Sequence, residues 1–240
     1  MIYLGAMGWS YKFWPIYGEA PSSEYLTYYA EHFNSVEVNS TFYRIPRKTS
    51  VAKWIDQTPD EFRFSVKIPK SISHSKALEY DIEKLDAFLD HIKPFGEKLG
   101  PLLLQLPPKL SPDHINQLDL VLTQLKKHRT AVEFRHKDWF TDTTYDLLRE
   151  HNVALVYVEH PWQPTALVET ADFNYIRLEG DRRKVDGEKG VVEVDRSEDN
   201  NRWAQQIKNT AKDTSLYVSK YYSGYPPNDI QMIASRLPRD

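Results

Sequence analysis

Residues 36–43 read VEVNSTFY, and this stretch poses the central problem of the fold. Val36 and Val38 are typical of a buried β-strand, whereas Glu37 and Asn39 share the opposite face, because side chains alternate sides along a strand. A carboxylate on a buried strand is costly unless it is paired or hydrogen-bonded. We therefore expect a fold in which one face of each strand packs under apolar helices while the other lines a polar space.

The same alternation recurs along the chain. Five further strand-like segments show a polar face opposite an apolar one, and their polar residues are Ser65 and Lys67, Gln105, Glu133 and Arg135, Glu159, and Arg177 and Glu179. The cations among them can neutralise the carboxylates, so the pattern predicts a compensated network rather than isolated buried charges. We expect all of these polar faces to point toward one common space.

Strand-like and helix-like segments alternate from end to end. Amphipathic spacing between the strands indicates helices, with Asp81, Ser111 and Thr141 as candidate N-caps. The stretch PWQPTALVETAD is the weakest helix candidate because it carries two prolines, and the charged stretch at 180–201 is expected to be a loop over the site. The eight expected strands are 2–5, 35–39, 63–68, 101–106, 130–134, 154–158, 174–179 and 215–219.

Eight such units in 240 residues fit one closed barrel. A typical (β/α)8 barrel has about 250 residues. The sequence contains neither a GxGxxG nor a Walker motif, which an open nucleotide-binding sheet would carry. The predicted fold class is α/β, a single (β/α)8 TIM barrel domain over residues 1–240, with the polar strand faces directed into the barrel near its C-terminal mouth.

Composition narrows the function classes. Lys and Arg number 31 against 34 Asp and Glu, so no overall positive charge indicates a nucleic-acid-binding protein. The absence of cysteine excludes disulfides, thiolate metal ligands and a cysteine nucleophile. The N-terminal MIYLGAMGWS lacks a basic region, and no apolar run reaches the 18 residues of a membrane span, so we expect a cytoplasmic protein without a membrane partner.

Several blocks together are similar to the YecE-like family, also called DUF72. They are GWSYKFW at 8–14, YYAEHFNSVEVNSTFYRIP at 28–46, KLGPLLLQLPP at 98–108, AVEFRHKDW at 131–139 and TADFNYIRLEG at 170–180. The resemblance implies a TIM barrel and no particular reaction. The sequence departs from the family pattern in KYYSGYPPND at 220–229, where Tyr221, Tyr222 and Ser223 replace an Asn-Asn-Asp type sequence.

The first functional interpretation is a hydrolase or lyase that acts on a polar, anionic small molecule at the barrel mouth. Glu37 and Glu133 are the candidate general acid and base, and His136 is a candidate proton shuttle. No metal or cofactor is expected. The expected substrate-binding residues are Trp9, Tyr11, Asn39, Tyr43, Lys67, Gln105, Arg135, Trp139, Arg177 and Glu179.

Two alternatives remain at this point. A metal-dependent, phosphodiesterase-like barrel would draw its ligands from Glu37, Glu133, Glu159, Glu179 and either His136 or His160. A nucleic-acid-binding barrel, possible but not favoured, would stack bases on rings at strand ends and loops. Those rings are Trp9, Tyr11, Phe13, Trp14, Phe42, Tyr43, Trp139, Tyr221 and Tyr222.

Overall fold

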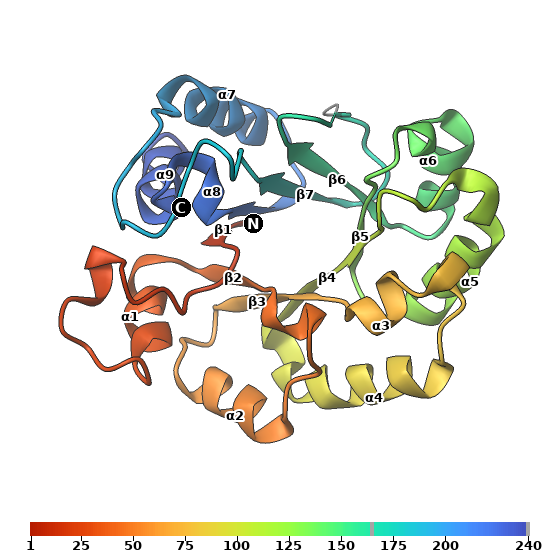
Figure 1. Cartoon of the computed structure of the whole chain (residues 1–240), viewed down its shortest axis with the longest axis horizontal. Helices are drawn as coiled ribbons and strands as arrows, with labels where there is room; N and C mark the ends of the chain where they lie inside the picture. The colour runs from red at the N-terminus through yellow and green to blue at the C-terminus, as the bar shows by residue number, and fades with distance from the viewer. Residues whose placement is uncertain (164–165, 239–240) are drawn as a thin grey trace.

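Eight parallel strands form the centre of the molecule. The computed structural model describes residues 1–163 and 166–238. Consecutive strands pair from β2 to β8, and β1 pairs with β8, so the order β1-β8-β7-β6-β5-β4-β3-β2 is that of a nearly closed (β/α)8 barrel (Figure 1). The strands are β1 Ile2–Ala6, β2 Ser35–Val38, β3 Arg63–Lys67, β4 Leu99–Gln105, β5 Thr130–Glu133, β6 Ala154–Glu159, β7 Phe173–Leu178 and β8 Asp213–Val218. All eight expected strands and the expected fold class are confirmed.

Helices surround the strands, and two apolar clusters result. The larger cluster fills the layer between strands and helices, and includes Val36 and Val38. The smaller one holds the apolar residues of the barrel interior, among them Leu103, Val156 and Tyr175. The helices are α1 Tyr25–His32, α2 Lys48–Asp56, α3 Lys70–Ser73, α4 Ile82–Ile92, α5 Ile115–Leu125, α6 Asp142–Glu150, α7 Ser197–Lys208, α8 Lys220–Ser223 and α9 Pro226–Ala234.

Side chains connect β1 to β2, the two strands at the ends of the pairing order. Asn34 Nδ2 donates to Ile2 O at 2.8 Å, and Leu4 N donates to Asn34 Oδ1 at 2.8 Å. The Tyr29 hydroxyl accepts from Ala6 N at 2.7 Å and donates to the carbonyl of Ser35 at 2.9 Å. These bonds satisfy backbone groups that a regular ladder would otherwise pair, so they close the barrel at this seam.

Helix starts agree with the expected caps at two of three positions. Asp81 accepts from Glu83 N at 3.0 Å, and Thr141 accepts from Thr144 N at 3.4 Å. Ser111 instead donates to Asp113 Oδ2 at 2.7 Å and precedes a short 3-10 turn, so α5 begins only at Ile115. Between β6 and β7, the part of the chain that the structure describes contains no helix; Pro164 and Thr165 of that stretch lie outside the described residues.

The prediction that Glu159 points into the barrel is wrong. Glu159 Oε2 accepts hydrogen bonds from Trp203 Nε1 and, at 2.8 Å, from Arg202 Nη2, both on α7. Val156 and Val158 occupy the inner face of β6. The parity of this strand was misassigned because both of its faces are apolar up to the last residue, and only the partners on α7 decide which side Glu159 takes.

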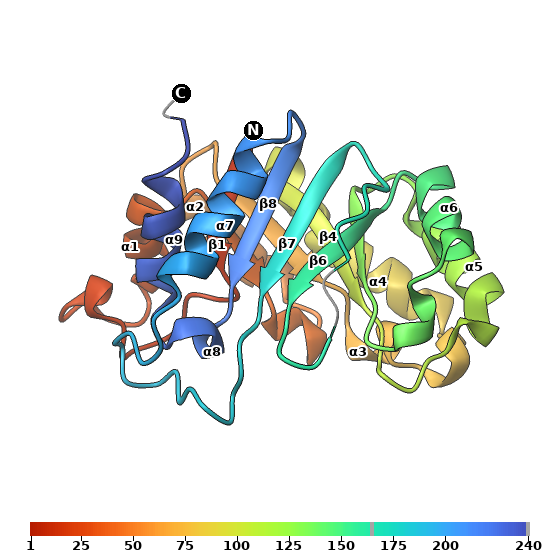
Figure 2. The same ribbon diagram turned by 90° about the horizontal axis from the view of Figure 1, so that it is seen from above.

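The long loop after β7 lies at the C-terminal end of the strands, as expected (Figure 2). It is shorter than predicted, since α7 begins at Ser197. Backbone contacts hold it: Glu193 N and Val194 N donate to Ser223 O at 2.7 and 3.0 Å. A Cβ on Gly190 would lie 2.0 Å from the carbonyl oxygen of Phe13, so only glycine permits this approach.

Candidate functional site

A pocket of about 710 Å³ opens at the C-terminal ends of the strands. Every strand contributes to it a residue at or just beyond its last position, which is the position where TIM barrels carry their sites. In strand order these residues are Met7, Asn39, Lys67, Gln105, Arg135, His160, Glu179 and Ser219. The polar strand faces therefore converge on one space, as predicted from the sequence. From β6 the contributing residue is His160 and not Glu159.

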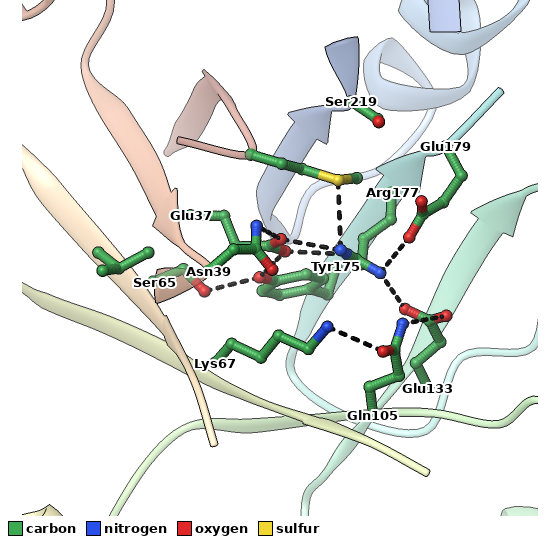
Figure 3. Close-up of polar contacts among 12 residues, drawn as sticks. Glu37, Asn39, Ser65, Lys67, Gln105, Glu133, Tyr175, Arg177, Glu179 and Ser219 are labelled. Carbon is green, nitrogen blue, oxygen red and sulfur yellow. Dashed lines mark hydrogen bonds and ion pairs between the residues drawn. The ribbon is translucent and has the colours of Figure 1, made fainter. Parts of the chain in front are cut away.

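Arg177 occupies the centre of the polar network (Figure 3). Its Nε and Nη2 donate to the two carboxylate oxygens of Glu37 at 3.0 and 2.9 Å, and Nη1 donates to Glu133 and Glu179. Nη2 also contacts Met7 Sδ at 3.2 Å. These three carboxylates hold the pKa of Arg177 above its ordinary value against the opposing effect of burial. All three guanidinium nitrogens of Arg177 already make contacts within the protein, so Arg177 positions the surrounding carboxylates and is not free to bind a ligand.

Glu133 is fully buried below the pocket. Its Oε1 accepts from Gln105 Nε2 at 2.9 Å and is paired with Arg135 Nε, and its Oε2 accepts from Arg177 at 2.5 Å. Burial raises its pKa, but the neighbouring Arg177 and Arg135 outweigh that effect and lower it to about 2. A carboxylate with this pKa and with both oxygens occupied is a weak base. The role of Glu133 in proton transfer stays a prediction.

Glu37, which posed the initial problem, is equally saturated. Besides its two bonds to Arg177, it accepts from Asn39 Nδ2 at 2.7 Å and from the Tyr175 hydroxyl at 2.7 Å. Tyr175 is in turn 2.6 Å from Ser65 Oγ, which donates to Pro101 O. Glu37 thus anchors Arg177 to the barrel interior, which explains how a carboxylate is tolerated on this strand. Its predicted role as acid or base is not tested by this geometry.

Lys67 differs from these saturated groups. Its Nζ donates to Gln105 Oε1 at 2.8 Å and lies 4.5 Å from the ring centroid of Phe42. Among the described residues, no carboxylate lies within ion-pair distance of it. Burial, and secondly the charge of Arg177, lower the pKa of Lys67 to about 8. The side chain is therefore a pocket-lining amine that is partly neutral near physiological pH.

The remaining predicted residues divide into two groups. Tyr11, Tyr43, Arg135 and Glu179 line the pocket together with Asn39, Lys67, Gln105 and Arg177. Trp139 is fully buried in the outer core, where it stacks on Phe134 and donates to Leu110 O. Trp9 packs edge-on against Trp54, and His136 accepts from Asp138 N at 3.3 Å, capping a short 3-10 turn. These last three lie outside the described lining of the pocket.

Sequence reasoning missed several residues of the pocket wall. His74, Trp162, Gln163, Arg182 and Lys220 reach it from loops and short helices, where no strand periodicity marks them. His160 had a usable signal, because it continues the inner face of Ala154, Val156 and Val158 on β6, and Ser219 likewise continues the inner face of Tyr217 on β8. In the sequence, His160 is a candidate only as an alternative metal ligand.

The divergent segment 220–229 supports the mouth and contributes to it. Tyr221 lines the pocket, whereas Tyr222 is fully buried. Ser223 Oγ donates to the buried carboxylate of Asp229, which also accepts from Asn200 Nδ2 at 2.9 Å. Burial raises the pKa of Asp229 to about 6. The segment thus ties the loop after β7 to α7 and α9.

The described residues contain neither a cluster of metal ligands nor a membrane-spanning helix. Within residues 1–163 and 166–238, no group of three or more His, Cys, Asp or Glu side chains is arranged to hold a metal ion. Over the same residues, none of the helices combines the length and apolar character needed to span a bilayer.

The fold and the pocket define a (β/α)8 barrel protein with a charge-lined site at the C-terminal mouth. Residues 3–240 match the family described as "Protein of unknown function DUF72", and the chain belongs to this family. The resemblance inferred from the sequence blocks is thereby confirmed.

Curated relatives and solved structures agree with this assignment. The chain is 37% identical over 141 residues to "UPF0759 protein YecE" of Escherichia coli K12, an alignment covering 58% of this chain and 50% of that protein. It is 30% identical over 154 residues to "UPF0759 protein YunF" of Bacillus subtilis 168, covering 61% of this chain and 55% of that protein. The alignments thus span about half the length of these relatives.

Two solved DUF72 proteins share the whole fold. A protein from Thermotoga maritima MSB8 superposes with a TM-score of 0.79 at 27% identity, covering 98% of both chains. A second, from Enterococcus faecalis V583, gives a TM-score of 0.83 at 22% identity, covering 100% of this chain and 97% of that one. The second likeness bears on the fold alone.

Proposed function

We propose that this protein is an enzyme, a hydrolase or lyase, that acts on a small anionic molecule bound at the C-terminal mouth of the barrel. The observation that carries the proposal is the charge of the pocket wall. Among the described residues, five cationic side chains line it against a single carboxylate, Glu179; the cations are Lys67, Arg135, Arg177, Arg182 and Lys220. Such an excess favours an anionic ligand.

The five cations are not equally available. Arg177 is consumed by the buried network, and Lys220 pairs with Glu188 at 2.6 Å. Lys67 and Arg182 have no carboxylate within ion-pair distance among the described residues, whereas Arg135 already pairs with Glu133 and, at 2.9 Å, with Glu179. A ligand anion can therefore pair with Lys67 and Arg182 without breaking the central network.

Aromatic rings favour a ligand with an apolar or ring portion. Phe42, Tyr43, Trp162, Tyr11 and Tyr221 line the same pocket, and the Tyr43 side chain is strongly exposed. Rings at a wall can stack on a planar group while cations hold its charged end. The pocket volume of about 710 Å³ is in the range of sites for small molecules.

Calorimetric titration with phenyl phosphate tests the binding half of this proposal, with inorganic phosphate and phenol as the two separate parts of the probe. Phenyl phosphate should bind more tightly than either part. Lys67→Met and Arg182→Met should each weaken its binding roughly 10- to 100-fold, the scale of a charge-assisted hydrogen bond. Lys127→Met, an exposed change outside the pocket lining, is the matched control and should leave Kd unchanged.

Turnover tests the enzymatic half. Wild-type protein and Lys67→Met are incubated with a panel of phosphate esters and oxo acids, and each mixture is followed by ³¹P and ¹H NMR. Consumption of a panel member by the wild type alone supports the proposal. Binding without any consumption would make this a binding protein, and tighter binding of a single-stranded oligonucleotide than of phenyl phosphate would move the assignment to nucleic acids.

A further inference from the structure

Lys67 has the position of a reacting group rather than of a supporting one. It is the last residue of β3 and lines the pocket, although only 8% of its surface is exposed. Its surroundings at Nζ are one amide oxygen, that of Gln105, and the face of the Phe42 ring. These two contacts hold the amine in place. Lys67 has no ion pair with a described carboxylate, so it can approach a pocket ligand without breaking one.

We infer that Lys67 is a covalent residue: its Nζ condenses with the carbonyl carbon of a small anionic aldehyde or ketone and forms a Schiff base in the pocket. This inference rests on the proposed function for the anionic part of the substrate, and it specifies the reactive part. It also selects the lyase over the hydrolase, since a protonated imine withdraws electrons from adjacent bonds and so assists their cleavage.

The step is balanced without any oxidant or reductant. The lone pair of the neutral amine forms a C–N bond to the carbonyl carbon; the carbonyl oxygen takes a proton and the nitrogen loses one, which gives a carbinolamine. The C–O bond then breaks, the oxygen leaves with a second proton as water, and the nitrogen lone pair forms the C=N bond of a protonated imine, which becomes neutral when the nitrogen loses its second proton. Amine and carbonyl therefore give imine and water.

His74 is the neighbour suited to move these protons. It lines the same pocket, and its ring centroid lies 4.9 Å from that of Phe42, the ring that Lys67 also contacts. Burial, and secondly the charge of Lys67, lower the pKa of His74, so its imidazole is neutral and able to accept a proton. Its Nδ1 is 3.0 Å from Ser73 Oγ, which fixes the orientation of the ring.

Burial, and secondly the charge of Arg177, keep part of the Lys67 amine neutral, as the reaction requires. The ionisable groups that act on it are Arg177, Glu133, Glu37, Glu179 and His74. The three carboxylates favour the ammonium form, but they are shared with Arg177 and, for two of them, with Arg135. Burial and Arg177 prevail, and the pKa of about 8 leaves a tenth or so of the amine neutral at pH 7.

Borohydride trapping tests the inference with pyridoxal 5′-phosphate, which joins an aldehyde, an aromatic ring and a phosphate. Full-length protein is mixed with the probe at equimolar concentration, reduced with sodium borohydride and mapped by peptide mass spectrometry. Lys67 should be modified at least tenfold faster than the exposed lysines of the same protein, because a pKa of about 8 in place of 10.5 makes the neutral fraction of its amine about 300-fold larger at pH 7, while burial slows access of the probe. Pyridoxal, which lacks the phosphate, should modify Lys67 more slowly, and inorganic phosphate should slow the modification by the full probe.

The controls separate the two proposals. Lys67→Arg keeps the charge but should give no adduct at position 67, and its modification pattern elsewhere should match the wild type. If phenyl phosphate binds normally but Lys67 is modified no faster than Lys127, the Schiff base is overturned and the anion site stands. If neither probe binds and modification is spread over surface lysines, both proposals fail.

Discussion

Two lysines of this barrel are buried to the same extent, and they differ in what surrounds the amine. Lys67 and Lys98 are each 8% exposed. Lys98 precedes the first residue of β4, at the N-terminal end of the strands, and Lys67 ends β3 at the opposite mouth. The Nζ of Lys98 donates to Ile55 O at 2.9 Å and to Thr58 O at 2.7 Å, with Asp60 at 3.9 Å.

The comparison shows which buried charges stabilise the fold. Lys98 donates to two backbone carbonyls at and just beyond the end of α2, so its burial is compensated. Lys67 has one hydrogen bond and a ring, and its pKa falls to about 8. A lowered lysine pKa means that folding disfavours the charged form, so Lys67 costs stability where Lys98 contributes it. In TIM barrels, function is found at the C-terminal end and stability at the N-terminal end.

Lys98→Met should have the largest effect on the free energy of unfolding. Removing the ammonium deprives the carbonyl of Thr58 of this donor and takes one of several donors from the carbonyl of Ile55, so the free energy of unfolding at pH 7 should fall by about 2–4 kcal/mol. Urea melts followed by circular dichroism measure this. The Kd of phenyl phosphate for the folded variant should equal that of the wild type, and a loss of binding with unchanged stability would reverse the roles assigned to the two ends.

Lys67→Met should change the free energy of unfolding in the opposite direction. The buried charge disappears while an apolar stem of similar length remains, so the free energy of unfolding at pH 7 should rise by about 1–2 kcal/mol after the lost bond to Gln105 is subtracted. The same urea melts apply, with Lys127→Met as the control that should stay within about 0.5 kcal/mol of wild type. Destabilisation of Lys67→Met by as much as Lys98→Met would show that both lysines are structural.

The gain from Lys67→Met should also depend on pH. Below pH 8 the lysine is charged in both the folded and the unfolded chain, so wild type carries the full cost of burial. Between pH 8 and about 10.5, the folded chain has lost this proton and the unfolded chain still holds it, so wild-type stability rises with pH relative to the variant. The 1–2 kcal/mol difference should therefore shrink over this interval and change sign before its upper end, because each pH unit changes it by about 1.4 kcal/mol. A difference that stays constant from pH 7 to 10 would contradict the lowered pKa.

Sequence reasoning succeeded where a regular period carried the information. The eight strands and the inner position of Glu37, Lys67, Glu133 and Arg177 follow from alternation along each strand. The predicted direction of the Glu159 side chain was wrong because β6 is apolar on both faces, so the strand itself does not indicate which face is inside. The same strand would have pointed to His160 if its inner face had been extended by one step.

Aromatic residues after strands were harder to assign, for a physical reason. Trp139 and Tyr221 both follow a strand, yet Trp139 fills the outer core and Tyr221 lines the pocket. Burial of a large ring is favourable in either place, so composition and local sequence position do not show whether a ring lies in the outer core or in the pocket wall. The hydrogen bonds of Asn34 and Tyr29 to backbone groups at the barrel seam could not be predicted from the sequence, since they depend on how two distant strands approach each other.

The central claim is that Lys67 is an available amine at an anion-binding mouth, and an NMR titration tests it most directly. Lysine side chains are labelled with ¹⁵N at Nζ, and the Lys67 resonance is assigned by its absence in Lys67→Arg. The account predicts a pKa near 8 in the free protein and a higher value when phenyl phosphate is bound, because the ligand anion stabilises the ammonium form. A Lys67 pKa at the ordinary 10.5, unchanged by phenyl phosphate, would contradict it.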